Sequence, residues 1–298
     1  MAKTKIEWTD KVWNPVTGCS KISEGCLNCY AEKFAKRLKN NPKLKGKYSN
    51  GFEPTFHMAE IKEHPEWKKG DKIFVGSMGD VFHEKLDYTC LDYIFGVPLN
   101  YPDCFFLFLT KRPDVNLKLF IASFRPNKFH FDKNIWLGVT AENQKRADER
   151  VPFLLETPCQ NKFLSIEPML GQIDITKYLR TGKLKWVICG GENGHNARPL
   201  HSEWVRFLMF QCRDYGVPFF FKGWGEWSNN TPEGIKLPSK SWAYVCPKDA
   251  TISYGISKGM DFSKEYVLYG KVGKKNSGAL IDGELIQQFP EELKLKGK

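Results

Sequence analysis

The 298-residue sequence lacks any apolar run near the ~20 residues that a membrane-spanning helix needs. Its longest apolar runs are Cys104–Leu109 and Pro218–Phe221. The first ten residues, MAKTKIEWTD, have no apolar signal-peptide core. The chain also shows no repeat and no low-complexity segment. These absences exclude the membrane-spanning class, and they predict a cytoplasmic protein with no membrane partner.

Acidic residues are scarce relative to basic ones. The sequence has 34 Asp and Glu against 45 Lys and Arg, which gives a formal net charge of +11. With 14% aromatic residues, this charge is compatible with a nucleic-acid or nucleotide substrate held by phosphate contacts and base stacking. The lysines are nevertheless spread along the chain, and no helix-turn-helix, zinc-finger or RNP signature is present. A basic surface would serve equally for an acidic electron donor such as a flavodoxin.

Short apolar runs recur through the middle of the chain at close to the ~30 residues of a β-α-β unit. Each run is continuous rather than alternating, which is typical of parallel strands buried on both faces. Segments with helical periodicity lie between the runs, for example 87–97 and 202–215, and Ser202 is the expected cap of the second. The runs begin near Lys72, Cys104, Asn134, Lys162, Lys185 and Val217.

This alternation predicts an α/β fold. With an earlier strand near Val12–Val16, it favours a full or partial (β/α) TIM-like barrel, and a doubly wound open sheet is the alternative. Residues 1–230 are expected to form the barrel. Asn229–Lys240 is rich in Pro, Gly and Asn and is typical of a linker or lid. Residues 231–298 contain only short strand-like pieces and are expected to form a small C-terminal appendage packed on the barrel.

Charged or hydrogen-bonding residues follow every predicted strand of the repeating series. The carboxyl ends of barrel strands converge on one mouth, where barrel enzymes keep their active sites. Glu167 stands directly after an apolar strand, where a carboxylate needs a partner or a role. Glu192 follows two glycines, which let a ligand approach the backbone closely. The candidate residues at the mouth are Ser77, Asp80, Lys111, Arg112, Glu142, Glu167, Glu192, Arg198 and Lys222.

Three of the nine cysteines gather in one loop after the first predicted strand. Cys19, Cys26 and Cys29 have the spacing C-x6-C-x2-C, and Gly18 and Gly25 permit tight turns beside them. A helix is expected from about Cys29, and its positive N-terminus would favour a thiolate. Three such cysteines fit a [4Fe–4S] cluster with one open iron, a zinc ion with a fourth protein ligand, or simple burial. The other six cysteines are scattered, several inside apolar stretches, and are expected to pack in the core.

Several motifs resemble those of the phage-associated three-cysteine-motif family, whose members are of unknown function. They are IEWTD, WNPVTGC, EGCLNCYAE, SMGDVFH, LTKRP, LGVTAEN, FLSIEPML, GGENGHNARP and the tail VGKKNSGALIDG, and they extend over nearly the whole chain. That family in turn is similar to radical SAM enzymes, which hold a [4Fe–4S] cluster on three cysteines after the first barrel strand. The usual radical SAM spacing is C-x3-C-x2-C, whereas the first gap here is six residues.

The resemblance implies an iron–sulfur enzyme that cleaves SAM reductively to modify an unknown substrate. Cys19, Cys26 and Cys29 would ligate the cluster. Asp80 would bind the SAM ammonium group, and Lys111 with Arg112 would bind the SAM carboxylate or a substrate phosphate. The remaining candidates are Ser77, Glu142 and Arg198 for cofactor binding, and Glu167, Glu192 and Lys222 for catalysis.

Two other functions stay open on the residues alone. The first is a zinc-stabilised nucleic-acid-binding module without catalysis, in which the cysteines would have a structural role. The second is a metal-free barrel enzyme that uses the acids of the mouth together with Lys222. The metal content of the purified protein separates the three hypotheses.

Overall fold

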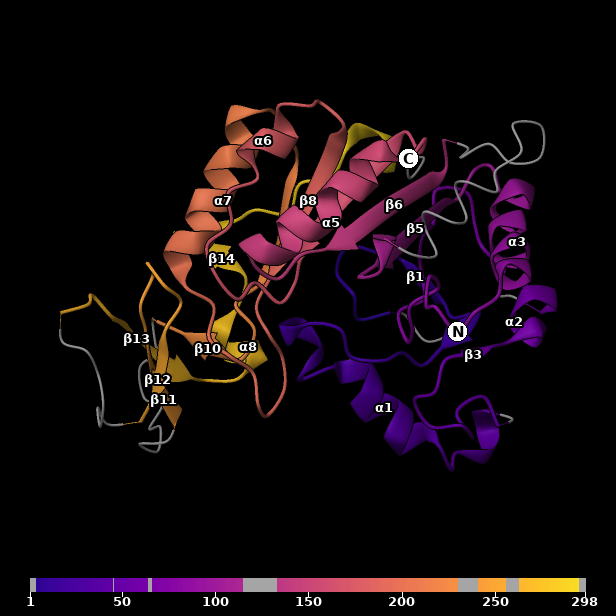
Figure 1. Ribbon diagram of the computed structural model, residues 1–298, viewed down its shortest axis with the longest axis horizontal. Coiled ribbons are helices and arrows are strands. Elements are labelled where there is room, and N and C mark those ends of the chain that lie inside the picture. The colour runs from indigo at the N-terminus through magenta and orange to yellow at the C-terminus, as the bar shows by residue number, and fades with distance from the viewer. Residues whose placement is uncertain are drawn as a thin grey trace.

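The main sheet of the computed structural model has seven parallel strands that follow one another in chain order (Figure 1). The structure describes residues 4–44, 46–63, 66–114, 133–229, 241–255 and 263–294. The sheet is curled into a half-barrel, which confirms the predicted partial TIM-like barrel. A doubly wound sheet would reverse its strand order at a switch point, and this sheet does not. The strands are β1 (Lys11–Trp13), β4 (Lys72–Val75), β5 (Phe105–Thr110), β6 (Ile135–Thr140), β7 (Asn161–Ile166), β8 (Leu184–Gly190) and β9 (Phe219–Gly223).

Helices connect the strands and cover the outer face of the sheet. The helix predicted over 87–97 is α3, and its N-cap Asp87 accepts a hydrogen bond from the Cys90 backbone amide at 3.0 Å. The helix predicted over 202–215 is α7, but its cap is His201 rather than Ser202. His201 Nδ1 accepts from the Glu203 amide at 3.2 Å. The helices are α1 (Tyr30–Leu38), α2 (Met58–Lys62), α3 (Tyr88–Gly96), α5 (Gln144–Glu156), α6 (Thr176–Leu179), α7 (Ser202–Asp214) and α8 (Lys274–Ser277).

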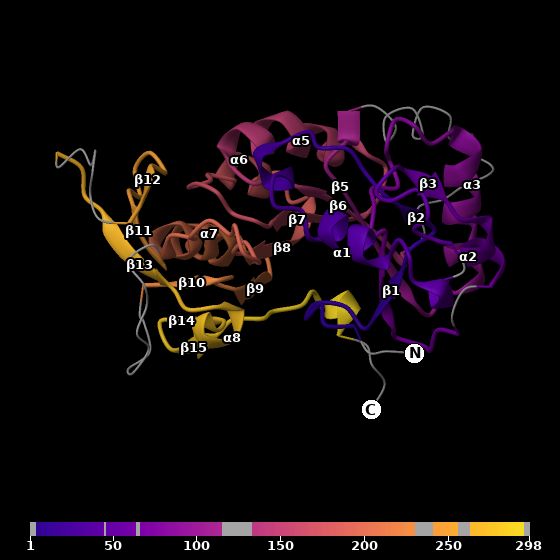
Figure 2. The same cartoon turned by 90° about the horizontal axis from the view of Figure 1, so that it is seen from below.

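Aromatic side chains fill the concave face of the sheet. Gly138 on β6 makes room for one of them, because a Cβ there would lie 2.5 Å from the Phe163 ring. The C-terminal segment closes this face, where Trp186 donates to the Gln288 carbonyl at 2.9 Å and its ring lies 5.3 Å from that of Phe289. Figure 2 shows this segment running below the sheet toward β1. The buried members of this cluster are Trp8, Phe74, Leu107, Trp136, Phe163, Trp186, Ile188, Phe220 and Leu293.

Residues beyond β9 form short antiparallel pairs. β10 (Trp227–Ser228), β11 (Trp242–Val245), β12 (Ile252–Tyr254) and β13 (Val267–Lys271) make one small sheet in the order β10-β13-β11-β12. β14 (Leu280–Ile281) pairs with β15 (Glu284–Leu285), and near the N-terminus β2 (Val16–Thr17) pairs with β3 (Thr55–Phe56). Apart from Asn229, the predicted linker lies outside the described residues.

All nine cysteines are free thiols. Five of the six scattered cysteines are buried, as the sequence predicts, and Cys90 is only partly buried. Among the described residues, none of the helices has the length and apolar character needed to cross a membrane.

Three histidines make the stability of the fold depend on pH. Burial lowers the pKa of His57, His83 and His201 below the ordinary value of 6.5. The unfolded chain therefore binds protons that the folded chain does not, so stability is present above that value and is lost as the pH falls below it. Urea unfolding should give a smaller free energy at about pH 5.5 than at about pH 7.5. His201→Gln should flatten this dependence, and a pH-independent free energy for the wild-type chain would contradict the account.

Candidate functional site

The three-cysteine loop begins after β1 and β2, at the edge of the main sheet where the carboxyl ends of its strands lie. The Gly18 amide donates to the Met78 carbonyl at 2.9 Å, and the Cys19 amide donates to the Phe52 carbonyl at 3.0 Å. Gly18 has φ +86°, and a Cβ there would lie 2.2 Å from the Glu53 carbonyl oxygen. Only glycine suits this position. Cys19 is thereby fixed beside the end of β4.

The second and third cysteines lie close together. Cys26 ends a 3-10 turn (Glu24–Cys26), and the Cys29 amide donates to the Cys26 carbonyl at 3.4 Å. Cys29 is the N-cap residue of α1, as the sequence predicts.

The thiol of Cys19 is held in its protonated form. Burial raises the pKa of Cys19 to about 12, the Asp80 carboxylate adds to this rise, and the Arg112 guanidinium opposes it. The charge of Cys26 adds a smaller rise. A bound metal would remove the proton from such a thiol. In the part of the chain that the structure describes, no three His, Cys, Asp or Glu side chains surround a common metal position. Binding of one metal centre by the three cysteines would therefore require a change in the conformation of the loop or of its side chains.

Arg112, at the end of β5, holds the first part of the loop. Its Nη2 donates to both the carbonyl and the hydroxyl of Ser20 at 2.7 Å, and its Nη1 pairs with Glu84 at 2.5 Å. Asp80 braces the same corner, because its carboxylate accepts from the Thr110 hydroxyl at 2.8 Å and from the Lys111 amide at 3.1 Å. The guanidinium of Arg112 thus binds the loop at Ser20.

Glu142, at the end of β6, holds the middle of the loop and is fully buried. Its Oε1 accepts from the Ser23 hydroxyl at 2.6 Å, and its Oε2 accepts from Arg150 at 2.9 Å. Lys111 Nζ lies 3.6 Å from Oε1. One carboxylate therefore joins the loop to two cations of the barrel.

Glu192, at the end of β8, holds the last part of the loop. Arg198 pairs with both of its carboxylate oxygens, at 2.6 Å and 2.8 Å, and Asn28 donates to it at 3.0 Å. Arg198 also reaches the Glu24 carbonyl at 3.0 Å. Bidentate pairs of this kind fix geometry as well as adding energy. Four predicted ligand-binding or catalytic residues, Arg112, Glu142, Glu192 and Arg198, thus hold the cysteine loop in place.

Glu167 and Lys222 form a separate ion pair at the ends of β7 and β9. Lys222 Nζ donates to Glu167 Oε1 at 2.5 Å, and both side chains are largely buried. Tyr30 lies nearby, with its hydroxyl donating to the Ser77 carbonyl at 2.5 Å. Desolvation raises the pKa of Tyr30 above its usual range although half of the residue's surface is exposed, and the charges of Cys29 and Glu167 act in the same direction. Of the two predicted catalytic carboxylates, Glu192 holds the cysteine loop. Glu167 instead pairs with Lys222, and its charge acts on Tyr30 at the start of α1.

Sequence reasoning assigned no role to several residues that build this site. Asn14 accepts from the Ser77 hydroxyl at 3.1 Å and from the Met78 amide at 3.0 Å, and so joins β1 to the end of β4. Ser23 and Asn28 stand between the cysteines, and their polarity was the available signal. Arg150 gave a weaker signal, a single arginine on the buried side of α5.

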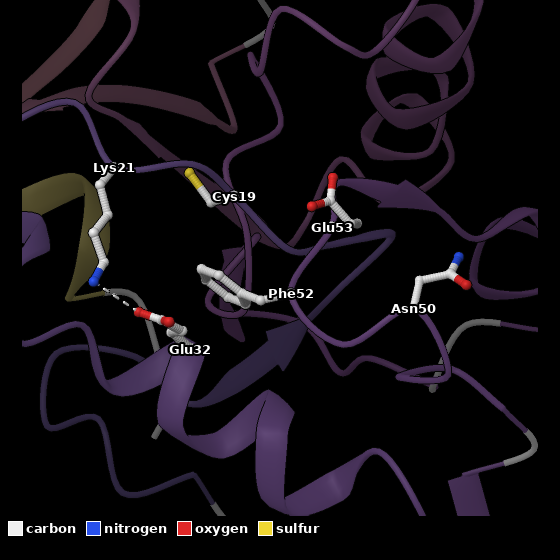
Figure 3. Close-up of a pocket in the computed structure, with 6 residues that line it drawn as sticks. All are labelled: Cys19, Lys21, Glu32, Asn50, Phe52 and Glu53. Atoms are coloured by element: carbon white, nitrogen blue, oxygen red, sulfur yellow. Dashed lines mark ion pairs between the residues drawn. The ribbon is translucent and has the colours of Figure 1, made fainter.

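A pocket of about 250 Å³ opens beside Cys19 on the outer side of the loop (Figure 3). Lys21 and Glu32 form an ion pair at 3.2 Å along one side of it. The Phe52 ring lies between Glu32 and Glu53 in this view, and Cys19 is on the same side as Lys21. The pocket gives a small molecule a route to the first cysteine. It is lined by Cys19, Lys21, Glu32, Asn50, Phe52 and Glu53.

A methyl group at Gly25 should displace the loop. A Cβ there would lie 2.4 Å from Glu142 Cγ and Oε1, and Glu142 is buried and paired with Arg150. Gly25→Ala is expected to destabilise the protein by ~1–3 kcal/mol and to lower metal uptake, measured by urea unfolding and by iron content. Gly96→Ala is the control, because no heavy atom lies within 4 Å of its added Cβ. Equal behaviour of the two variants would contradict the packing described here.

The fold and site define a partial (β/α) barrel with a three-cysteine loop clamped over its mouth. The chain belongs to a family of proteins of unknown function, DUF5131, whose family model matches residues 3–290. Comparison with curated proteins finds no significant match.

Among solved structures, the chain is similar to spore photoproduct lyase. A cysteine-to-serine mutant of that enzyme matches with 10% identity and a TM-score of 0.44, over 86% of this chain and 71% of the other. A double mutant with bound AdoMet and dinucleoside spore photoproduct matches with 9% identity and a TM-score of 0.37, over 85% and 70%. At such low identities and TM-scores, these likenesses assign no function to this chain.

Proposed function

We propose that this protein is a radical SAM-like iron–sulfur enzyme, in which Cys19, Cys26 and Cys29 hold a [4Fe–4S] cluster. One observation carries the proposal: ion pairs and hydrogen bonds from the ends of β5, β6 and β8 all clamp the loop that bears these cysteines. A loop that merely connected two elements would not need buried charges from three strands, because burying them is costly. The clamping fits a loop whose backbone must be kept beside the mouth of the barrel.

The donor set fits a cluster better than a structural zinc ion. Structural zinc takes four protein ligands, whereas a [4Fe–4S] cluster on three cysteines leaves one iron open to a small molecule. Two histidines near the loop could complete a zinc site, but the Nε2 of His57 is bonded to the Thr17 hydroxyl at 2.7 Å and that of His83 to the Ser20 hydroxyl at 2.9 Å. The three thiols are free and partly exposed, which leaves them accessible to the metal.

Other residues of the chain would position the cysteine loop and bind SAM. Arg112, Glu142, Glu192 and Arg198 act as positioning residues, because their side chains hold the loop. Lys111 is the member of the Lys111–Arg112 pair proposed for the SAM carboxylate, since its side chain is partly exposed and its ion pair with Glu142 is long, at 3.6 Å.

Asp80 and Ser77 keep the predicted cofactor-binding role at the end of β4. Asp80 lies close enough to Cys19 for its charge to raise the pKa of that thiol. Ser77 presents its carbonyl to the Tyr30 hydroxyl. Both residues therefore border the space in front of the cysteines, where the ammonium group of SAM would be bound.

Glu167 and Lys222 would act on the substrate. The Lys222 ammonium neutralises the Glu167 carboxylate, so the pair can bind a polar group or exchange a proton at Glu167 Oε1 without leaving an uncompensated charge in the barrel. The bound cluster and SAM would supply one-electron reductive cleavage of the sulfonium, with the electron taken from an external one-electron donor.

The test uses the full chain, reconstituted anaerobically with iron and sulfide. After reduction it should give an EPR signal that changes when SAM is added, because SAM would bind the open iron. A reduced cluster whose signal ignores SAM, and a protein that binds zinc and no iron, would each refute the proposal.

A further inference from the structure

The exposed face of α1 carries aromatic and basic side chains in alternation. Tyr30, Lys33, Phe34 and Arg37 are spaced i, i+3, i+4 and i+7, which places them on one side of the helix. Tyr30 is 50% exposed and Phe34 49% exposed, unusually open for large rings. The Arg37 guanidinium lies 5.9 Å from the Phe34 ring centroid, and the two rings are 6.5 Å apart.

The positive charge of this helix is only partly neutralised. Glu32 is the one acid of α1, and it is shared by Lys21 at 3.2 Å and Lys36 at 2.8 Å. Within the described ranges, no acidic side chain forms an ion pair with Lys33, Arg37, Lys39 or Lys43. A surface with this charge attracts a polyanion.

The surface continues past α1 to the small C-terminal sheet. A Cβ on Gly194 would lie 3.6 Å from Lys33 Nζ, so the lysine reaches the loop after β8. Lys271 donates to the carbonyl of the neighbouring His195, and its ammonium lies 5.8 Å from the Trp227 ring. Tyr254, 54% exposed, packs beside Trp227 at 5.9 Å. A second group of aromatic and basic side chains therefore follows the first, and Figure 1 shows α1 and this sheet on the same side of the barrel.

We infer that this surface, from α1 to Lys271 and Tyr254, binds single-stranded or locally unpaired nucleic acid. Exposed rings offer stacking platforms to bases, and the cations between them meet phosphates. An acidic protein would complement the positive charge, but its carboxylates would not stack on the exposed aromatic rings that alternate with the cations. The surface also leads to the candidate site, because Tyr30 directly follows Cys29 and its hydroxyl donates to the Ser77 carbonyl at the end of β4.

The binding of nucleic acid does not depend on the proposed function. Only the further conclusion, that the bound nucleic acid is the substrate, rests on the proposed function. A base stacked on the exposed ring of Tyr30 would lie at the residue that directly follows Cys29. Binding itself needs neither the cluster nor SAM, and so it can be measured separately.

The experiment measures binding of a fluorescent oligothymidylate to the full-length protein by anisotropy, over a range of salt concentrations. With about four phosphates neutralised, the slope of log K against log salt should be about −3. Phe34→Ala should weaken binding about tenfold through lost stacking. Lys33→Ala with Arg37→Ala should reduce the slope by about one half. Iron content and the free energy of unfolding should stay at wild-type values in these variants.

The matched control lies on α7, on the outer face of the barrel. Phe210 there is 41% exposed and Arg213 lies 4.7 Å from its ring centroid, so the same kind of pair stands away from the mouth. Phe210→Ala and Arg213→Ala should leave oligonucleotide binding unchanged.

Three results would overturn the inference: no effect of Phe34→Ala, equal binding of a duplex of the same length, or equal competition by poly-glutamate, which would indicate an acidic protein partner. A brown protein that does not bind the oligonucleotide refutes this inference alone. A colourless protein that binds it refutes the proposed function alone.

Discussion

Replacing any one of Cys19, Cys26 and Cys29 by alanine is expected to abolish iron binding and SAM cleavage completely. The proposed cluster takes all three thiols of the loop, and the two nearby histidines are bonded to hydroxyls, His57 to that of Thr17 and His83 to that of Ser20. The measurement is iron content and visible absorbance after anaerobic reconstitution, together with 5′-deoxyadenosine formation from SAM under reducing conditions.

The control for these variants is Cys90→Ala. Cys90 is also free and partly buried, but it lies on α3, away from the loop. It should keep full iron content. If Cys19→Ala also keeps its iron and activity, the three-cysteine site is wrong, and the metal-free barrel enzyme becomes the better hypothesis.

The second large effect is expected from Arg150→Met. Arg150 and Glu142 are both buried, and their ion pair at 2.9 Å is backed by a bond from Arg150 to the Thr140 carbonyl at 2.7 Å. Removing the guanidinium leaves a buried carboxylate that keeps only the more distant Lys111 as a cation. The loss is expected to be ~3–5 kcal/mol, measured by urea unfolding at unchanged slope.

A matched ion pair on the surface gives the control. Arg206 contacts Asp282 through two bonds, at 2.8 Å and 2.5 Å, but both side chains are substantially exposed. Arg206→Met should cost no more than ~1 kcal/mol, because exposed pairs contribute little. Similar losses for the two variants would show that burial of the Glu142 carboxylate does not govern the stability of the mouth.

The strands were predictable because each is marked by a continuous apolar run of neighbouring residues. A continuous apolar run such as that of β8 has few ways to be buried other than as a central parallel strand. The first strand was predicted less well. The expected strand near Val12–Val16 is split into β1 and β2 at Asn14 and Pro15, since proline cannot donate a ladder hydrogen bond.

The site was only partly predictable because its contacts are distant in sequence. The pattern placed Glu142 and Glu192 at the mouth, but the first contacts Ser23 across 119 residues and the second contacts Asn28 across 164. A strand end shows that a carboxylate is present and does not show its partner. Glu142 was therefore expected to bind the cofactor and Glu192 to act in catalysis, and their contacts with the cysteine loop were not foreseen. Glu167 differs because its partner, Lys222, also lies at a strand end.

The most direct test is the metal and sulfide content of anaerobically purified full-length protein. The account predicts a brown protein with about four iron and four sulfide per chain. A colourless protein with one zinc ion per chain and no sulfide would contradict it.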